Sequence, residues 1–155
     1  MNLRQTILLA LAILAPAALH GQNTGNVSWA TSVKIVSLHE AKLTITASIL
    51  PGWHLYSQYL EDGGPQPTRF AFTPERNVDM SGFTEKGVPR TYHDDLYEMD
   101  ITWYANKVVF ESTIMLAEPK IVLTGTVEYM TCNAYQCVPG RNTLSVPIDL
   151  TKNTP

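Results

Sequence analysis

The residues of this chain best suited to carry chemistry are its two cysteines. Cys132 and Cys137 are the only cysteines among the 155 residues, and four residues lie between them. A stretch of chain of this length spans about 17 Å when extended, whereas a disulfide needs its two Cα atoms within about 7 Å. A bond between the pair therefore requires a sharp turn. Asn133 suits such a turn because an asparagine side chain can bond the nearby backbone.

Three chemical roles are open to this pair. A bridge that closes so short a loop stabilises a fold by only about 2 kcal/mol in the loop-entropy account. Local bridges at turns are also the ones that tend to exchange with other thiols. The spacing alone therefore leaves a structural disulfide and a redox pair as equal alternatives. A third is a Cu(I) site in which Met130 joins the two cysteines, and His54 or His93 could approach it only through folding.

Alternation of apolar and polar residues predicts the strands that must position the pair. In residues 42–50 every second residue is apolar, which is typical of a half-buried strand. The same period of two occurs in residues 108–116, with Ser112 as an exception, and in residues 143–150. Pro147 cannot donate to a strand ladder, so the last strand should lie at an edge of a sheet or carry a bulge.

Weaker patterns complete an all-β prediction. Further strands are predicted over residues 33–38, 53–57, 68–72, 100–104 and 121–132, and loops over residues 61–67, 87–89 and 138–140. No convincing helical stripe extends over twelve residues. About eight short strands separated by turns predict an antiparallel β-sandwich of immunoglobulin-like type.

The first 21 residues predict a secretory signal peptide. Arg4 precedes an apolar run over residues 6–19, and the small residue Gly21 follows it. The run is shorter than the roughly 20 apolar residues that a membrane-spanning helix needs, and Pro16 interrupts it. We expect cleavage after Gly21 and a single domain over residues 22–155, secreted into an oxidising compartment.

Composition excludes several classes of protein. The formal net charge of −3 has the wrong sign for a nucleic-acid binder, so we expect no nucleic-acid partner. A hydrophobic fraction of 45% argues against a disordered chain. Two cysteines are too few for the disulfide framework of a small secreted scaffold.

Three segments carry a family resemblance. They are residues 51–58 (PGWHLYSQ), 93–97 (HDDLY) and 129–139 (YMTCNAYQCVP). In this order they resemble the N-terminal domain of thiol:disulfide interchange protein DsbD, also called the disulfide bond corrector domain, across residues 26 to 150. Three details depart from the family pattern: four residues separate the cysteines where five are usual, Gly140 stands where a second proline is common, and the cap segment is shorter by about two residues.

The resemblance implies an immunoglobulin-like sandwich in the periplasm that relays electrons. The dithiol would receive them from a thioredoxin-like protein or a membrane electron donor and pass them by thiol–disulfide exchange to oxidised periplasmic thiol proteins. Such a relay has protein-disulfide reductase activity and needs no cofactor and no metal. Cys137 corresponds to the cysteine that forms mixed disulfides with partners, and Cys132 to the one that resolves them.

The resemblance also assigns residues around the sulfurs. Leu96 or Tyr97 corresponds to a cap that shields the cysteine pair. His54 and Tyr56 correspond to residues that line the site, and Asp94 and Asp95 to acidic residues of the cap. Two functions from other classes remain as alternatives. One is a non-catalytic immunoglobulin-like binding domain with a structural disulfide, and the other is a periplasmic Cu(I) binder.

Overall fold

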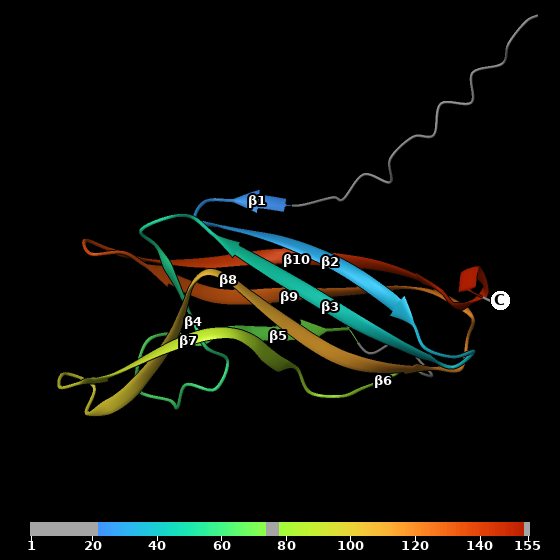
Figure 1. Ribbon diagram of the computed structural model, residues 1–155, viewed down its shortest axis with the longest axis horizontal. Coiled ribbons are helices and arrows are strands. Elements are labelled where there is room, and N and C mark those ends of the chain that lie inside the picture. Colours follow the sequence, from blue (N-terminus) through green and yellow to red (C-terminus); the bar gives the residue numbers. More distant parts are fainter. Residues whose placement is uncertain (1–21, 74–77, 154–155) are drawn as a thin grey trace, which may run out of the picture.

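Strands, most of them with alternating burial, make up most of the described chain (Figure 1). The computed structural model describes residues 22–73 and 78–153, and the predicted signal peptide lies outside these ranges. The described elements are β1 (Gln22–Thr24), β2 (Val27–Ile35), β3 (Glu40–Ile49), β4 (His54–Tyr56), β5 (Arg69–Phe72), β6 (Val78–Met80), β7 (Thr84–Asp94), β8 (Met99–Leu116), β9 (Lys120–Cys132), β10 (Cys137–Asp149) and the 3-10 helix η1 (Leu150–Asn153).

All the strand pairings are antiparallel, and the order is β1-β2-β3-β8-β4-β9-β10, with β5 on β9 and with β6 and β7 on β8. The long strand β8 joins the parts of the fold, because its C-terminal half pairs with β3 while its N-terminal part pairs with β4. In Figure 1, β2, β3 and β10 lie on one side of the core and β5, β6 and β7 on the other. The predicted antiparallel immunoglobulin-like sandwich is confirmed.

The core forms where the alternating patterns predicted it. In β3, Leu43 and Ile45 are fully buried. Trp29 of β2 is 1% exposed and lies 5.2 Å from the ring of Tyr129 and 6.0 Å from the ring of Phe70, measured between ring centroids. Edge-to-face and tilted aromatic pairs of this kind each add about 1 kcal/mol beyond their buried area. These contacts join β2, β5 and β9 into one core.

Two predicted loops are strands instead. Residues 87–89 lie in β7, at a register shift against β8, and residues 138–140 lie in β10. β7 is mostly exposed and carries no alternating apolar residues, so its pairing with β8 leaves no hydrophobic signal in the sequence. β10 lies at the end of the strand order, which confirms the edge position predicted from Pro147.

A glycine allows the β9–β10 hairpin to hold a buried tyrosine. Gly140 lies directly opposite Tyr129, and a Cβ atom at Gly140 would overlap the Tyr129 ring. The Tyr129 hydroxyl donates a hydrogen bond to Asn142 Oδ1 at 2.9 Å. The ring therefore covers the glycine backbone, and this explains why no proline stands at position 140.

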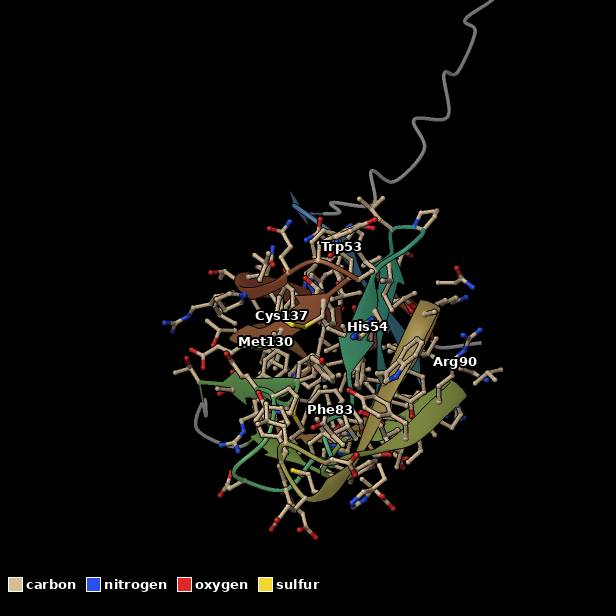
Figure 2. All side chains as sticks on the ribbon, turned by 90° about the vertical axis from the view of Figure 1, so that its left-hand side faces the viewer. Trp53, His54, Phe83, Arg90, Met130 and Cys137 are labelled. Atoms are coloured by element: carbon tan, nitrogen blue, oxygen red, sulfur yellow. A yellow bond between two sulfur atoms is a disulfide. The ribbon has the colours of Figure 1, made fainter. Side chains whose placement is uncertain are left out.

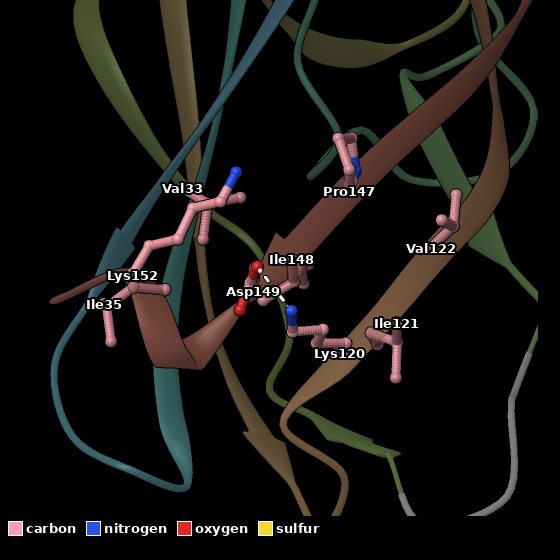
Figure 3. A pocket seen from close by; sticks show the side chains of 9 residues that line it. All are labelled: Val33, Ile35, Lys120, Ile121, Val122, Pro147, Ile148, Asp149 and Lys152. Carbon is pink, nitrogen blue, oxygen red and sulfur yellow. Dashed lines mark ion pairs between the residues drawn. The ribbon is translucent and has the colours of Figure 1, made fainter. Parts of the chain in front are cut away.

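A groove of about 660 Å³ lies far from the cysteines (Figure 3). Its lining comes from the C-terminal part of β2, the start of β9, the end of β10 and η1: Val33, Ile35, Lys120, Ile121, Val122, Pro147, Ile148, Asp149 and Lys152. The Lys120 ammonium pairs with the Asp149 carboxylate at 3.3 Å. Cys137 begins β10 and Asp149 ends it, so the groove and the cysteines lie at opposite ends of the hairpin.

Candidate functional site

The two cysteines form a disulfide at the turn of the β9–β10 hairpin. Cys132 ends β9, Cys137 begins β10, and their Cα atoms are 4.0 Å apart. The Asn133 N–H donates to the Gln136 carbonyl at 2.9 Å, and the Asn133 side-chain oxygen accepts from the N–H groups of Tyr135 (2.8 Å) and Gln136 (2.9 Å). The predicted turn, with Asn133 as its organising residue, is confirmed.

The two sulfurs have different surroundings. Cys132 is only 2% exposed, whereas Cys137 is exposed at the end of the molecule. Figure 2 looks onto this end, where Cys137 and the sulfur–sulfur bond lie beside Met130. A small second hydrophobic cluster encloses Cys132; it consists of Tyr56, Leu60 and Ile101, with Met99, Trp103 and Met130 packed against it. An attacking thiolate from outside can therefore reach Cys137 more easily than Cys132.

Tyr56 contacts the buried sulfur directly. Strand β4 pairs with both β8 and β9, which places His54 opposite Cys132 and turns Tyr56 toward the same cluster. The Tyr56 hydroxyl donates a hydrogen bond to Cys132 Sγ at 3.2 Å. Burial, together with the nearby Tyr92, Tyr97 and Asp94, raises the pKa of Tyr56 to about 12. The phenol is therefore protonated, and able to donate, throughout the physiological pH range.

His54 is a neutral neighbour of the disulfide. Its ring lies 4.6 Å from the Trp103 ring and 5.3 Å from the Tyr56 ring, and its Nε2 is 3.4 Å from the Tyr56 hydroxyl. Burial lowers the pKa of His54, so the imidazole carries no charge at pH 7. His54 therefore adds no positive charge that would favour a thiolate. The guanidinium of Arg90 lies over the Trp103 ring, at 5.2 Å from its centroid.

The proposed cap residues lie at the tip of the β7–β8 hairpin. Asp94 Oδ1 accepts hydrogen bonds from the N–H groups of Leu96 (2.9 Å) and Tyr97 (3.2 Å), and Asp94 Oδ2 accepts one from the Tyr92 hydroxyl (3.3 Å). Leu96 is 83% exposed and Tyr97 43% exposed, and Asp95 is also exposed. Tyr97 is close enough to Tyr56 to influence its pKa. In the described part of the chain, neither Leu96 nor Tyr97 forms a hydrogen bond to the disulfide.

A carboxylate outside the site predicted from the sequence holds the neighbouring backbone. Glu85 of β7 accepts hydrogen bonds from the Ser57 hydroxyl (2.8 Å), the Gln58 N–H (2.6 Å) and the Tyr104 hydroxyl (2.8 Å). Burial, together with this bond to Glu85, raises the pKa of Tyr104. Because Ser57 follows Tyr56 directly, Glu85 fixes the chain that carries the donor to Cys132. Nearly 30 residues separate Glu85 from Ser57, so no local pattern could have revealed this contact.

Of the residues considered for Cu(I) binding, Met130 and His54 lie beside the cysteine pair. His93 bonds Asp100 within the β7–β8 hairpin, with Nδ1 and Oδ1 3.0 Å apart. The described residues contain no group of three or more His, Cys, Asp and Glu side chains arranged for a metal ion. With Cys132 and Cys137 bonded to each other, neither offers a thiolate to Cu(I).

Within the described residues, no helix is long and apolar enough to cross a membrane.

These features define a class of protein: an antiparallel β-sandwich with a half-exposed disulfide on a hairpin turn at one end. The chain matches the family model for the N-terminal domain of thiol:disulfide interchange protein DsbD over residues 24–148. It therefore belongs to that family, as the three sequence segments predicted. No curated protein sequence matches the chain.

Solved structures agree with this fold. The N-terminal periplasmic domain of ScsB from Proteus mirabilis matches 86% of this chain with a TM-score of 0.60 and 17% identity. The matched part spans 51% of that chain, about half its length. The GAE domain of yeast GGA1 matches 84% of this chain and 100% of its own, with a TM-score of 0.51 and 11% identity. At these identities the likeness concerns the fold alone.

The hydrogen bond from Tyr56 should speed opening of the disulfide. If a reductant attacks Cys137, Cys132 leaves as a thiolate, and a hydrogen bond to a charged group is worth more than one to a neutral group. We expect Tyr56→Phe to slow reduction by dithiothreitol about tenfold. Tyr59→Phe is the matched control, because the Tyr59 hydroxyl bonds the Phe83 carbonyl and not a sulfur. Equal reduction rates for the two variants would show that the Tyr56 hydroxyl has no such role.

Proposed function

We propose that this protein is a periplasmic relay module that passes reducing equivalents through the Cys132/Cys137 pair. The observation that carries the proposal is the asymmetry of the disulfide: Cys137 is exposed, while Cys132 is buried and accepts a hydrogen bond from Tyr56. Membership of the DsbD N-terminal family supports it. A bridge used only for stability gains nothing from an exposed sulfur, whereas exchange requires access to one.

The exchange would run in two balanced steps. A thiolate of a reduced partner attacks Cys137 Sγ and forms an intermolecular disulfide. The electron pair of the broken bond goes to Cys132 Sγ, which is beside the Tyr56 hydroxyl and takes a proton from solvent. The second thiolate of the partner then attacks its own bonded sulfur and releases Cys137. The partner dithiol becomes a disulfide, and this protein becomes a dithiol.

The reduced module would then reverse the roles. The Cys137 thiolate attacks the disulfide of an oxidised periplasmic thiol protein, and Cys132 resolves the mixed disulfide that results. The electron donor would be a thioredoxin-like protein or a membrane protein, because thiol–disulfide exchange needs cysteine sulfurs in the partner as well as in this protein. No cofactor takes part in either step.

The β7–β8 hairpin would protect the pair between partners. A tyrosine over the sulfurs would slow indiscriminate oxidation in an oxidising compartment, and the less exposed Tyr97 suits this role better than Leu96. We expect Tyr97→Ala to speed oxidation of the reduced protein by a small disulfide severalfold, while Leu96→Ala leaves the rate unchanged. An unchanged rate in Tyr97→Ala would contradict the role as a cap.

A coupled enzyme assay tests the relay itself. The oxidised protein is mixed with thioredoxin, thioredoxin reductase and NADPH, and NADPH consumption is followed. The proposal predicts that one NADPH is consumed for each disulfide, because one disulfide takes up two electrons. A variant with serine at both cysteine positions should consume none above background. Failure of the unaltered protein to consume NADPH would contradict a relay that accepts electrons from thioredoxin-like donors.

A further inference from the structure

The β7–β8 hairpin, at the same end of the molecule as the exposed sulfur, carries a group of acidic residues. In Figure 1 the tips of the β7–β8 and β9–β10 hairpins lie at the same end of the molecule. Tyr56 links them, since it bonds Cys132 and lies close enough to Asp94 and Tyr97 for both to influence its pKa. The acidic residues on the β7–β8 hairpin form what we call the acidic rim: Asp94, Asp95, Glu98 and Asp100.

Positive charge at this end does not balance the acidic rim. Arg90 lies over the Trp103 ring, and Arg141 is 3.5 Å from Glu128 across the β9–β10 hairpin. His93 bonds Asp100 within the rim itself. The end of the molecule that carries Cys137 is therefore negative overall.

Large apolar side chains project from both hairpin tips. Tyr135 is 95% exposed on the turn between the two cysteines, and Leu96 is 83% exposed on the neighbouring tip. The turn that presents Tyr135 is held by two hydrogen bonds to Asn133, so the exposed ring is carried on an ordered backbone. Exposed apolar groups that a polar rim surrounds are typical of protein-binding surfaces.

We propose that this end is a docking face for thiol proteins whose reactive cysteine lies in a positively charged, partly apolar surface, and that it disfavours anionic thiols such as glutathione. The inference rests on the proposed relay function. Reactive cysteines owe their low pKa to nearby Lys, Arg or His⁺ or to the positive end of a helix, so partner surfaces that meet Cys137 have positive potential around their own cysteines. A negative rim attracts them and speeds encounter, while it repels an anionic disulfide.

Small disulfides of different charge test the electrostatic part without a known partner. At pH 7 cystamine is doubly cationic, glutathione disulfide is doubly anionic and hydroxyethyl disulfide is neutral. With each probe, the Cys137 thiolate attacks and expels one thiol, and Cys132 then attacks Cys137 and expels the second. One protein disulfide and two small thiols result. The oxidation rate of the reduced full chain is measured with each probe.

The test variant combines Glu98→Gln with Asp100→Asn, which removes two charges while a glutamine or asparagine oxygen can still accept hydrogen bonds. The ratio of variant to wild-type rate cancels the intrinsic reactivity of each probe. A rim carboxylate about 10 Å from a charge on the probe would change the rate about twofold in water. Relative to the neutral probe, we expect the cystamine rate to fall and the glutathione disulfide rate to rise, each about fourfold. Both changes should disappear at high salt.

A matched variant controls for charge elsewhere. Asp79→Asn combined with Glu118→Gln removes two exposed carboxylates near the other end of the sandwich, and it should leave all three ratios unchanged. If the rim variant changes all three rates by one factor, or none of them, the charge selection is contradicted. That result would leave the relay intact, because exchange at Cys137 would still occur. A protein that does not react with any probe would instead contradict the relay.

Peptide disulfides test the apolar part. Two cystine-linked peptides are compared, both with lysines, but one with leucines and the other with serines beside the cysteine. Tyr135→Ser should slow the reaction of the leucine peptide severalfold and leave that of the serine peptide unchanged. Equal effects on both peptides would show that Tyr135 does not contribute an apolar contact.

Discussion

The thiol of a Cys132→Ser variant should react with an alkylating reagent about 100-fold faster than the thiol of a Cys137→Ser variant. The first variant retains the exposed Cys137, and the second retains Cys132, which is 2% exposed and surrounded by Tyr56, Leu60 and Ile101. Burial both blocks the reagent and disfavours the reactive thiolate. The rates are measured by mass spectrometry with excess iodoacetamide at pH 8.

Denaturant provides the control for this comparison. In urea the two variants should react at similar rates, because the difference arises from the folded surroundings and not from the cysteines themselves. Equal rates in the folded state, or faster reaction at Cys132, would contradict the assignment of Cys137 as the sulfur that partners attack. The same Cys132→Ser variant should accumulate mixed disulfides with reactive thiol proteins, since no second thiol remains to resolve them.

Gly140→Ala should lower the free energy of unfolding by about 3 kcal/mol. The new Cβ would overlap the ring of Tyr129, whose contact with Trp29 and hydrogen bond to Asn142 help to join β9 and β10 to the core. Either the ring or the strand must move, and overpacking of this kind is costly where neighbours are buried. Urea unfolding with the disulfide intact measures the change, which should appear as a lower midpoint with an unchanged slope.

Gly82→Ala is the matched control for the stability measurement. No atom lies within 4 Å of a Cβ at Gly82, and its backbone does not adopt the left-handed conformation. We expect it to leave stability unchanged or to raise it slightly, because alanine restricts the unfolded chain. A loss as large as that of Gly140→Ala would show that the overlap with Tyr129 is not the cause.

Sequence patterns gave the core strands and the turn because the signals for both are local. The alternation in residues 42–50 appears as the buried Leu43 and Ile45 of β3, and Asn133 organises the turn through bonds to residues two and three positions away. Strand β7 was missed because its side chains are mostly exposed and its position is set by pairing with β8.

The detailed site could not be derived in the same way. The hydrogen bond from Tyr56 to Cys132 joins residues 76 positions apart, and it forms only because β4 lies between β8 and β9. The family resemblance implied a site role for Tyr56, but it contained no information on the contacts of Glu85. The unequal exposure of the two sulfurs likewise depends on the cluster that the sandwich builds around Cys132.

The reduction potential of the Cys132/Cys137 pair tests the relay most directly. The full chain is equilibrated in glutathione or dithiothreitol buffers at pH 7, free thiols are blocked, and the oxidised and reduced forms are separated by mass. The relay predicts a reversible couple above about −300 mV, within reach of thiol–disulfide partners. A potential well below about −300 mV would identify the pair as a structural bridge and contradict the proposed function.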